Sequence, residues 1–105
     1  MSDSPSFFAL FVNLQNRPVL LVGAGVVAER KALALLKAGA RIQVVAQELS
    51  ERFVCWQEEG TIEYLGKEFS PELLAPVYLA VAATDDEALN QRVFAAAEAL
   101  SLIHI

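Results

Sequence analysis

The sequence predicts a doubly wound α/β fold, in which a parallel sheet lies between two layers of helices. Three observations lead to this prediction: short apolar segments alternate with helix-like segments, several of the apolar segments have no polar residue, and a glycine pair separates the first clear strand from the first clear helix. Strands that are covered on both faces are apolar along their whole length. Parallel neighbours also need a connection long enough to hold a helix, which the alternation supplies.

The first predicted elements are a short strand over residues 7–14 and, after a turn that ends at Pro18, a buried strand over 19–22. A helix is predicted over 26–38, because small and apolar residues recur on one helical face. Gly39 ends this helix, as a glycine just beyond a helix C-terminus commonly does. The residues on the apolar face are Ala28, Ala32, Leu35 and Leu36.

The rest of the chain continues the same alternation of strands and helices. Ser70 and Pro71 open a short helical or irregular stretch, which Pro76 closes. The last predicted strand is apolar throughout, as a central parallel strand is when both its faces are covered. The further predicted elements are a strand over 42–46, a helix over 49–59, a strand over 61–65, the central strand over 77–83 and a helix over 87–100.

Length and composition restrict the possible classes of function. With 105 residues, 55% of them hydrophobic, the chain can build one core, so a single domain over residues 1–105 is expected. A formal charge of −5 argues against a nucleic-acid partner, which clustered Lys and Arg would bind. No apolar segment approaches the ~20 residues that span a bilayer, and no signal-peptide pattern opens the chain, so no membrane partner and a cytoplasmic location are expected. The single Cys55 resembles a small apolar residue on a helix, and no metal-ligand set is predicted.

The stretch VLLVGAGVVAERK places its two glycines where a strand gives way to a helix. In the turn of Gly23, Ala24 and Gly25, the first glycine permits a tight bend and the second lets the backbone approach a pyrophosphate, while Ala28 allows close helix–strand packing. The N–H groups at the helix start can hold phosphate, aided by the helix dipole. The charged residues 29–31 are expected to form a solvated helix face. The glycine spacing alone is common, but its place between strand and helix favours dinucleotide binding over a structural turn.

The residue that would bind the adenosine ribose is less clear. An acid about 20 residues beyond the glycines usually does so, but here the second strand ends at Ala46, which Gln47 and Glu48 follow. Gln47 could bond the ribose and Glu48 could repel a 2′-phosphate; equally, Glu48 could only complement the dipole of the next helix. No Arg lies at this strand tip to receive a 2′-phosphate, so NAD is favoured over NADP.

Two polar features follow the central strand. In AATDDEALNQRV, Thr84 and Glu87 fit a capping box, with Asp85 and Asp86 as ordinary first-turn residues. The same loop leaves the carboxyl end of a central strand, where ligands of open α/β sheets bind, and both interpretations can hold together. His104 has no carboxylate partner nearby in the sequence and is expected to be solvated or packed rather than catalytic.

Two segments of the chain carry a more specific similarity: FFALFVNLQNRPVLLVGAGVVAERKALALLKAGARIQVVAQEL over residues 7–49 and LAVAATDDEALNQRV over 79–93. Through the GAGVVAERK continuation and the AATDDEALN run, the chain resembles the precorrin-2 dehydrogenase domain of siroheme synthases, a family that includes stand-alone dehydrogenase/ferrochelatases. The resemblance implies a Rossmann fold that binds NAD and oxidises precorrin-2, a tetrapyrrole, to sirohydrochlorin. It also implies NAD contacts at Val26 and Val27 and at Gln47 and Glu48.

The end of the chain departs from this family. The family continues after the last helix into an NVVD-like segment, whose aspartate is implicated in dehydrogenation and chelation, and then into a dimerisation region. Residues 101–105, SLIHI, do not match that segment and are expected to be an atypical tail. The chain is therefore expected to be a truncated, cofactor-binding part with no catalytic residue, and a homodimer is expected only for a full-length chain.

Three classes of function are compatible with these patterns. The leading one is an NAD-dependent dehydrogenase of siroheme synthesis, whose nicotinamide accepts a hydride. The second is a non-catalytic NAD-sensing module, such as the regulatory domains of potassium-transport systems. Such a module would more naturally carry an acid at the tip of the second strand, where this chain has Ala46 and Gln47. The third is a structural interaction domain, which would leave Gly23 and Gly25 without a ligand.

Overall fold

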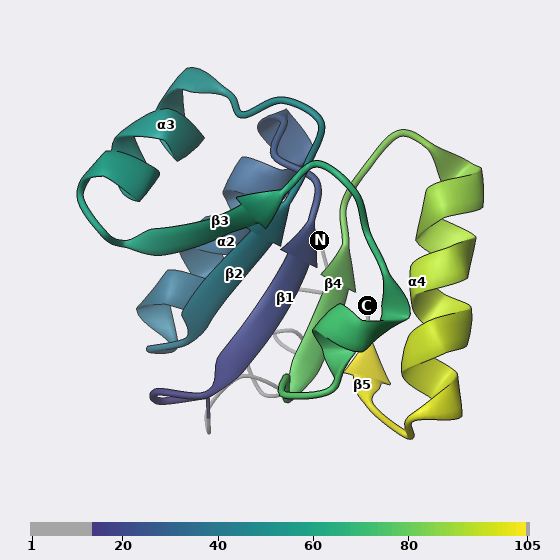
Figure 1. The fold of residues 1–105 in the computed structure, drawn as a ribbon. Helices are drawn as coiled ribbons and strands as arrows, with labels where there is room; N and C mark the ends of the chain where they lie inside the picture. The colour runs from purple at the N-terminus through teal and green to yellow at the C-terminus, as the bar shows by residue number, and fades with distance from the viewer. Residues whose placement is uncertain (1–13, 105) are drawn as a thin grey trace, which may run out of the picture.

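The computed structural model describes residues 14–104, which contain one sheet of five parallel strands in the order β3-β2-β1-β4-β5 (Figure 1). β1 pairs with both β2 and β4, so the order of the strands reverses between β1 and β4. The predicted strand over 7–14 lies outside the described residues except for Leu14, which is buried. The strands are β1 (Pro18–Val22), β2 (Arg41–Val45), β3 (Ile62–Gly66), β4 (Leu79–Ala82) and β5 (Ile103–His104).

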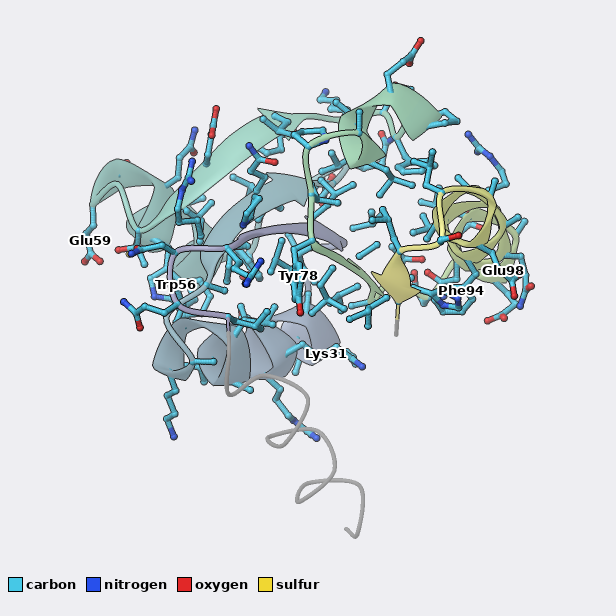
Figure 2. The ribbon with its side chains drawn as sticks, turned by 90° about the horizontal axis from the view of Figure 1, so that it is seen from below. Lys31, Trp56, Glu59, Tyr78, Phe94 and Glu98 are labelled. Carbon is cyan, nitrogen blue, oxygen red and sulfur yellow. The ribbon has the colours of Figure 1, made fainter. Side chains whose placement is uncertain are left out.

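Helices cover both faces of this sheet, which confirms the predicted doubly wound, three-layer α/β fold (Figures 1 and 2). The crossovers from β1 to β2 and from β2 to β3 run one way across the sheet, while the crossover from β4 to β5 runs the other way. Right-handed crossovers in opposite directions place their helices on opposite faces. The helices are α2 (Val26–Lys37) and α3 (Glu51–Glu58) on one face, and η1 (Pro71–Leu74) and α4 (Glu87–Ala99) on the other.

Each face of the sheet has its own apolar core. Val19 and Leu21 of β1 pack with α2 and α3, while Leu20 and Val22 pack with η1 and α4. Successive side chains of a strand point to opposite faces, so a central strand with two covered faces must be apolar at every position. This explains the uninterrupted apolar segments in the sequence.

The C-terminal end of α2 is set by Gly39, as the sequence predicts. Gly39 has a φ of +85°, and its N–H donates to Leu36 O at 3.0 Å. The N–H of Ala40 donates to Leu35 O at 3.1 Å. These two bonds form a Schellman motif, which satisfies carbonyls that the helix end would otherwise leave without partners.

Two predictions about single residues can be compared with the structure. Cys55 lies on α3 as predicted, and its side chain is exposed. The buried residue of this helix is Phe53, and a residue two positions further along points to the opposite side. His104 is packed as expected, with the centre of its ring 5.1 Å from that of the Phe94 ring on α4.

Residues 101–104, predicted to be atypical, enter the sheet through β5. Ile103 and His104 pair in register with Leu79 and Ala80 of β4. Within residues 14–104, no helix combines the length and the apolar character needed to cross a bilayer.

Candidate functional site

A pocket of about 470 Å³ opens at the carboxyl edge of the sheet, toward which the strand arrows point in Figure 1. The turns that follow β1, β2, β3 and β4 form its walls, so it lies where the strand order reverses. This is the position at which open α/β sheets bind their ligands. All nine predicted binding residues line it: Gly23, Ala24, Gly25, Val26, Val27, Gln47, Glu48, Thr84 and Asp85.

Gly23 is required by the fold itself. Its φ is +121°, a conformation that favours glycine. A Cβ at this position would lie 2.8 Å from the carbonyl carbon of Ala83, at the end of β4. The N–H of Gly23 also donates to Val45 O at 2.8 Å, which joins the turn to the end of β2. The glycine thus lets the chain turn tightly between two neighbouring strands.

Gly25 has a different role, because nothing in the fold requires a glycine there. Its φ of −100° and ψ of −159° are extended values that any residue can adopt, and a Cβ would meet no atom within 4 Å. The residue is the N-cap of α2, so the space in front of it faces the N–H groups that begin the helix. In glycine turns of this kind, the absence of a Cβ at the second glycine lets a pyrophosphate approach the backbone, and this open space favours such a ligand.

The first turn of α2 presents two unusually exposed apolar side chains beside the glycine turn. Val26 is 70% exposed and Val27 is 58% exposed, although both belong to the pocket wall. The opposite side of the same helix is anchored by Ala28, which is fully buried against the sheet. The small side chain of Ala28 therefore allows the close packing that the sequence predicts.

The turn after β2 is fixed by the turn after β3. Gln47 Nε2 donates to Lys67 O at 3.2 Å and to Glu68 Oε2 at 3.4 Å. Lys67, Glu68 and Phe69 also line the pocket, yet the sequence reasoning missed them. One signal could have identified them: they follow the predicted strand 61–65, and every parallel strand ends at the same edge.

The loop after β4 is held by Asn90 and not by the predicted capping box. Thr84 Oγ1 donates to Asn90 Oδ1 at 2.7 Å, and Asn90 Nδ2 donates to Thr84 O at 2.9 Å. The N-cap of α4 is Asp86, whose Oδ1 accepts from Leu89 N at 3.1 Å. The predicted capping box of Thr84 and Glu87 is therefore wrong. The Thr84 hydroxyl donates to Asn90 and accepts from the N–H of Asp86, so it is already hydrogen-bonded before the helix begins. Thr84 and Asp85 of this loop line the pocket.

Ser50 connects the glycine turn to the start of α3. Its N–H donates to Ala24 O at 3.1 Å, and its hydroxyl donates to Glu29 Oε2 at 2.6 Å. The same hydroxyl oxygen accepts from Phe53 N at 3.4 Å, which makes Ser50 the N-cap of α3. Glu29 and Lys31 are half-buried and only Arg30 is exposed, so the prediction of a wholly solvated face over 29–31 is wrong for Glu29 and Lys31.

A family model described as "Putative NAD(P)-binding" matches residues 10–104 of the chain. The chain belongs to this NAD(P)-binding family. The match covers the glycine turn, all four turns around the pocket and strand β5. The family therefore agrees with the ligand class that the open space at Gly25 favours.

Relatives of the chain include several siroheme synthases. It is 48% identical over 93 residues to the siroheme synthase of Actinobacillus pleuropneumoniae serotype 3 (strain JL03), which covers 89% of this chain and 19% of that protein. It is 50% identical over 91 residues to siroheme synthase 2 of Yersinia enterocolitica, which covers 87% of this chain and 19% of that protein. The chain thus spans about a fifth of the siroheme synthases that it matches.

Two solved structures share the fold. The precorrin-2 dehydrogenase SirC is 36% identical with a TM-score of 0.73, over 78% of this chain and 41% of that one. Shikimate dehydrogenase from Aquifex aeolicus is 23% identical with a TM-score of 0.59, over 77% of this chain and 29% of that one, and shows a similar fold. The Rossmann-like architecture is therefore established both by the strand order of this chain and by its similarity to these solved structures.

Proposed function

We propose that this chain is the NAD-binding part of an enzyme that oxidises precorrin-2 to sirohydrochlorin. The observation that carries the proposal is the glycine turn at the point where the strand order reverses, with open space in front of Gly25. The siroheme synthases and the precorrin-2 dehydrogenase that resemble this chain supply the substrate class. These relatives favour the dehydrogenase over the alternative of a potassium-transport regulator.

Different turns of the pocket bind different parts of the cofactor. The turn of Gly23, Ala24 and Gly25 and the first N–H groups of α2 hold the pyrophosphate, with Val26 and Val27 packed beside it. Gln47 and Glu48, from the turn after β2, bind the adenosine ribose, while Thr84 and Asp85 border the nicotinamide half. NAD supplies the hydride acceptor, and the protein supplies orientation and electrostatics.

The proposal assigns precorrin-2 turnover to a longer protein than this chain. The match with the precorrin-2 dehydrogenase SirC covers 41% of that protein, and we propose that further residues help to position the tetrapyrrole. Orientation of two reactants contributes roughly 7–11 kcal/mol to the acceleration of a reaction. A homodimer for a full-length chain and a cytoplasmic location are part of the same proposal.

The test is an anaerobic assay with precorrin-2 and NAD, followed by the absorbance of NADH and sirohydrochlorin. We expect a protein expressed to the natural end of its reading frame to form both products, and the 105-residue chain to form neither while it still binds NAD. Sirohydrochlorin formation by the longer protein without NADH would refute the proposed reaction. Rapid NADH formation by the short chain would show that the additional residues are dispensable.

A further inference from the structure

We propose that the turn after β3 makes the pocket accept NAD and reject NADP in two ways: Glu68 and the backbone carbonyl of Lys67 orient Gln47, and the negative charge of the Glu68 carboxylate repels a 2′-phosphate. This inference rests on the proposed function and adds positioning residues from the turn after β3, which the usual ribose-binding motif does not include. It concerns the end of the pocket formed by the turns after β2 and β3.

The amide of Gln47 has only one chemically reasonable orientation. Its two polar neighbours, Lys67 O and Glu68 Oε2, lie 3.2 and 3.4 Å from Nε2, and both are hydrogen-bond acceptors. The NH₂ group must therefore face them, and its two hydrogens are both used. Within residues 14–104 the other amide atom, Oε1, accepts no hydrogen bond.

The turn after β3 is held rigidly enough to impose this orientation. Tyr64 Oη donates to Ala46 O at 2.8 Å, and Ala46 N donates to Gly66 O at 3.1 Å. A bulge at the end of β3 also places Gly66, in place of Leu65, opposite Val45. Bulges of this kind redirect the chain beside binding sites. The backbone that carries the Lys67 carbonyl and Glu68 is thus fixed to the end of β2 immediately before Gln47.

The result is a surface that accepts hydrogen bonds and carries more negative than positive charge. At the turns after β2 and β3, Gln47 offers only an acceptor oxygen, and Glu48 and Glu68 each add a carboxylate, against the ammonium of Lys67. The other cation that lines the pocket, Arg92, belongs to α4, and the loop before that helix adds the carboxylates of Asp85 and Asp86. A ribose 2′-hydroxyl can donate a hydrogen bond to Gln47 Oε1. A 2′-phosphate has no hydrogen to offer at neutral pH and would meet two carboxylates. NAD is therefore accepted and NADP is rejected, without any acid at the usual position.

The variant Glu68→Gln tests this inference, because it keeps the shape of the side chain and removes its charge. We expect the dissociation constant for NADP to fall about three- to tenfold, while that for NAD changes less than about twofold. The matched control is Glu63→Gln. Gln43 Nε2 donates to Glu63 Oε1 at 3.5 Å across the same two strands, but neither residue lines this pocket.

The measurement is calorimetric titration of both cofactors into the native chain and the two variants, with thermal unfolding as a control for folding. The deciding quantity is the ratio of the dissociation constant for NADP to that for NAD. A ratio that falls in Glu68→Gln and stays unchanged in Glu63→Gln supports the inference. An unchanged ratio in Glu68→Gln, with native NAD binding intact, overturns it and leaves the proposed function standing. Failure of the native chain to bind NAD overturns both.

Discussion

Replacing Gly25 by valine should abolish NAD binding and leave the fold intact. The backbone at this residue is extended, with φ −100° and ψ −159°, and an added Cβ meets nothing within 4 Å. A β-branched residue favours extended backbone, so no strain arises. The remaining cost is the preference for glycine over valine at an N-cap, and we expect the free energy of unfolding to fall by no more than about 1 kcal/mol.

The effect on binding is larger, because the valine side chain occupies the space through which a pyrophosphate reaches the backbone. A hydrogen bond to a charged group is worth about 1.5–3 kcal/mol. Loss of two such bonds to the N–H groups of the turn weakens binding by about 3–6 kcal/mol. This corresponds to a dissociation constant raised at least about 100-fold.

Gly23→Ala is the informative comparison, because it should lower the stability of the fold, whereas Gly25→Val should lower the affinity for NAD. A Cβ on Gly23 would lie 2.8 Å from the backbone of Ala83, and the residue has a φ of +121°. The left-handed backbone costs about 1–2 kcal/mol for a non-glycine residue, and overpacking adds about 1–3 kcal/mol. Gly23→Ala should therefore be destabilised by several kcal/mol, whereas Gly25→Val should not.

Urea denaturation followed by circular dichroism gives the stability of each variant, and calorimetric titration gives its affinity for NAD. The reasoning requires a folded Gly25→Val that does not bind and a destabilised Gly23→Ala. If folded Gly25→Val bound NAD within about threefold of the native affinity, the interpretation of the turn as a phosphate site would be wrong.

Three further substitutions test the network around the pocket. Asn90→Ala removes the bonds that hold Thr84, so urea denaturation should show a loss of about 1–3 kcal/mol and titration a weaker affinity for NAD; unchanged affinity would mean that this loop does not contribute to the site. Ser50→Ala removes the cap of α3 and the hydrogen bond to Glu29, with an expected loss of about 1 kcal/mol in the same denaturation assay, and a native-like midpoint would contradict that role. Cys55→Ser, on an exposed position, should change stability by less than about 0.5 kcal/mol; a larger loss would show that the thiol is packed in solution.

The features that the sequence predicted well are those determined by neighbouring residues. The uninterrupted apolar residues of β1 indicated a strand with two covered faces, and Gly39 ended α2 at the expected place. The roles of Gly23 and Ala28 also follow from local geometry, because a tight turn and a close helix contact each favour a small residue. These patterns were sufficient for the fold and for the strand–helix junction that forms one wall of the pocket.

The features that the sequence missed depend on residues far apart in the chain. Glu29 is bonded by Ser50, and Gln47 by Glu68, each 21 residues away. Neither partner is visible until the order of the strands is known. Thr84 has the sequence signature of an N-cap, but its hydroxyl is engaged by Asn90 six residues later, so the helix begins at a different residue. Local propensity was overridden there by a competing side-chain hydrogen bond.

The central claim, that this chain is an NAD-binding domain that discriminates against NADP, is tested most directly by calorimetric titration of the native 105-residue chain with each cofactor at equal ionic strength. The glycine turn and the acceptor surface at Gln47 and Glu48 predict one saturable site for NAD, with NADP bound at least about tenfold more weakly. No saturable binding of NAD would contradict the assignment of the pocket. Equal affinity for the two cofactors would contradict the account of how the turns after β2 and β3 select between them.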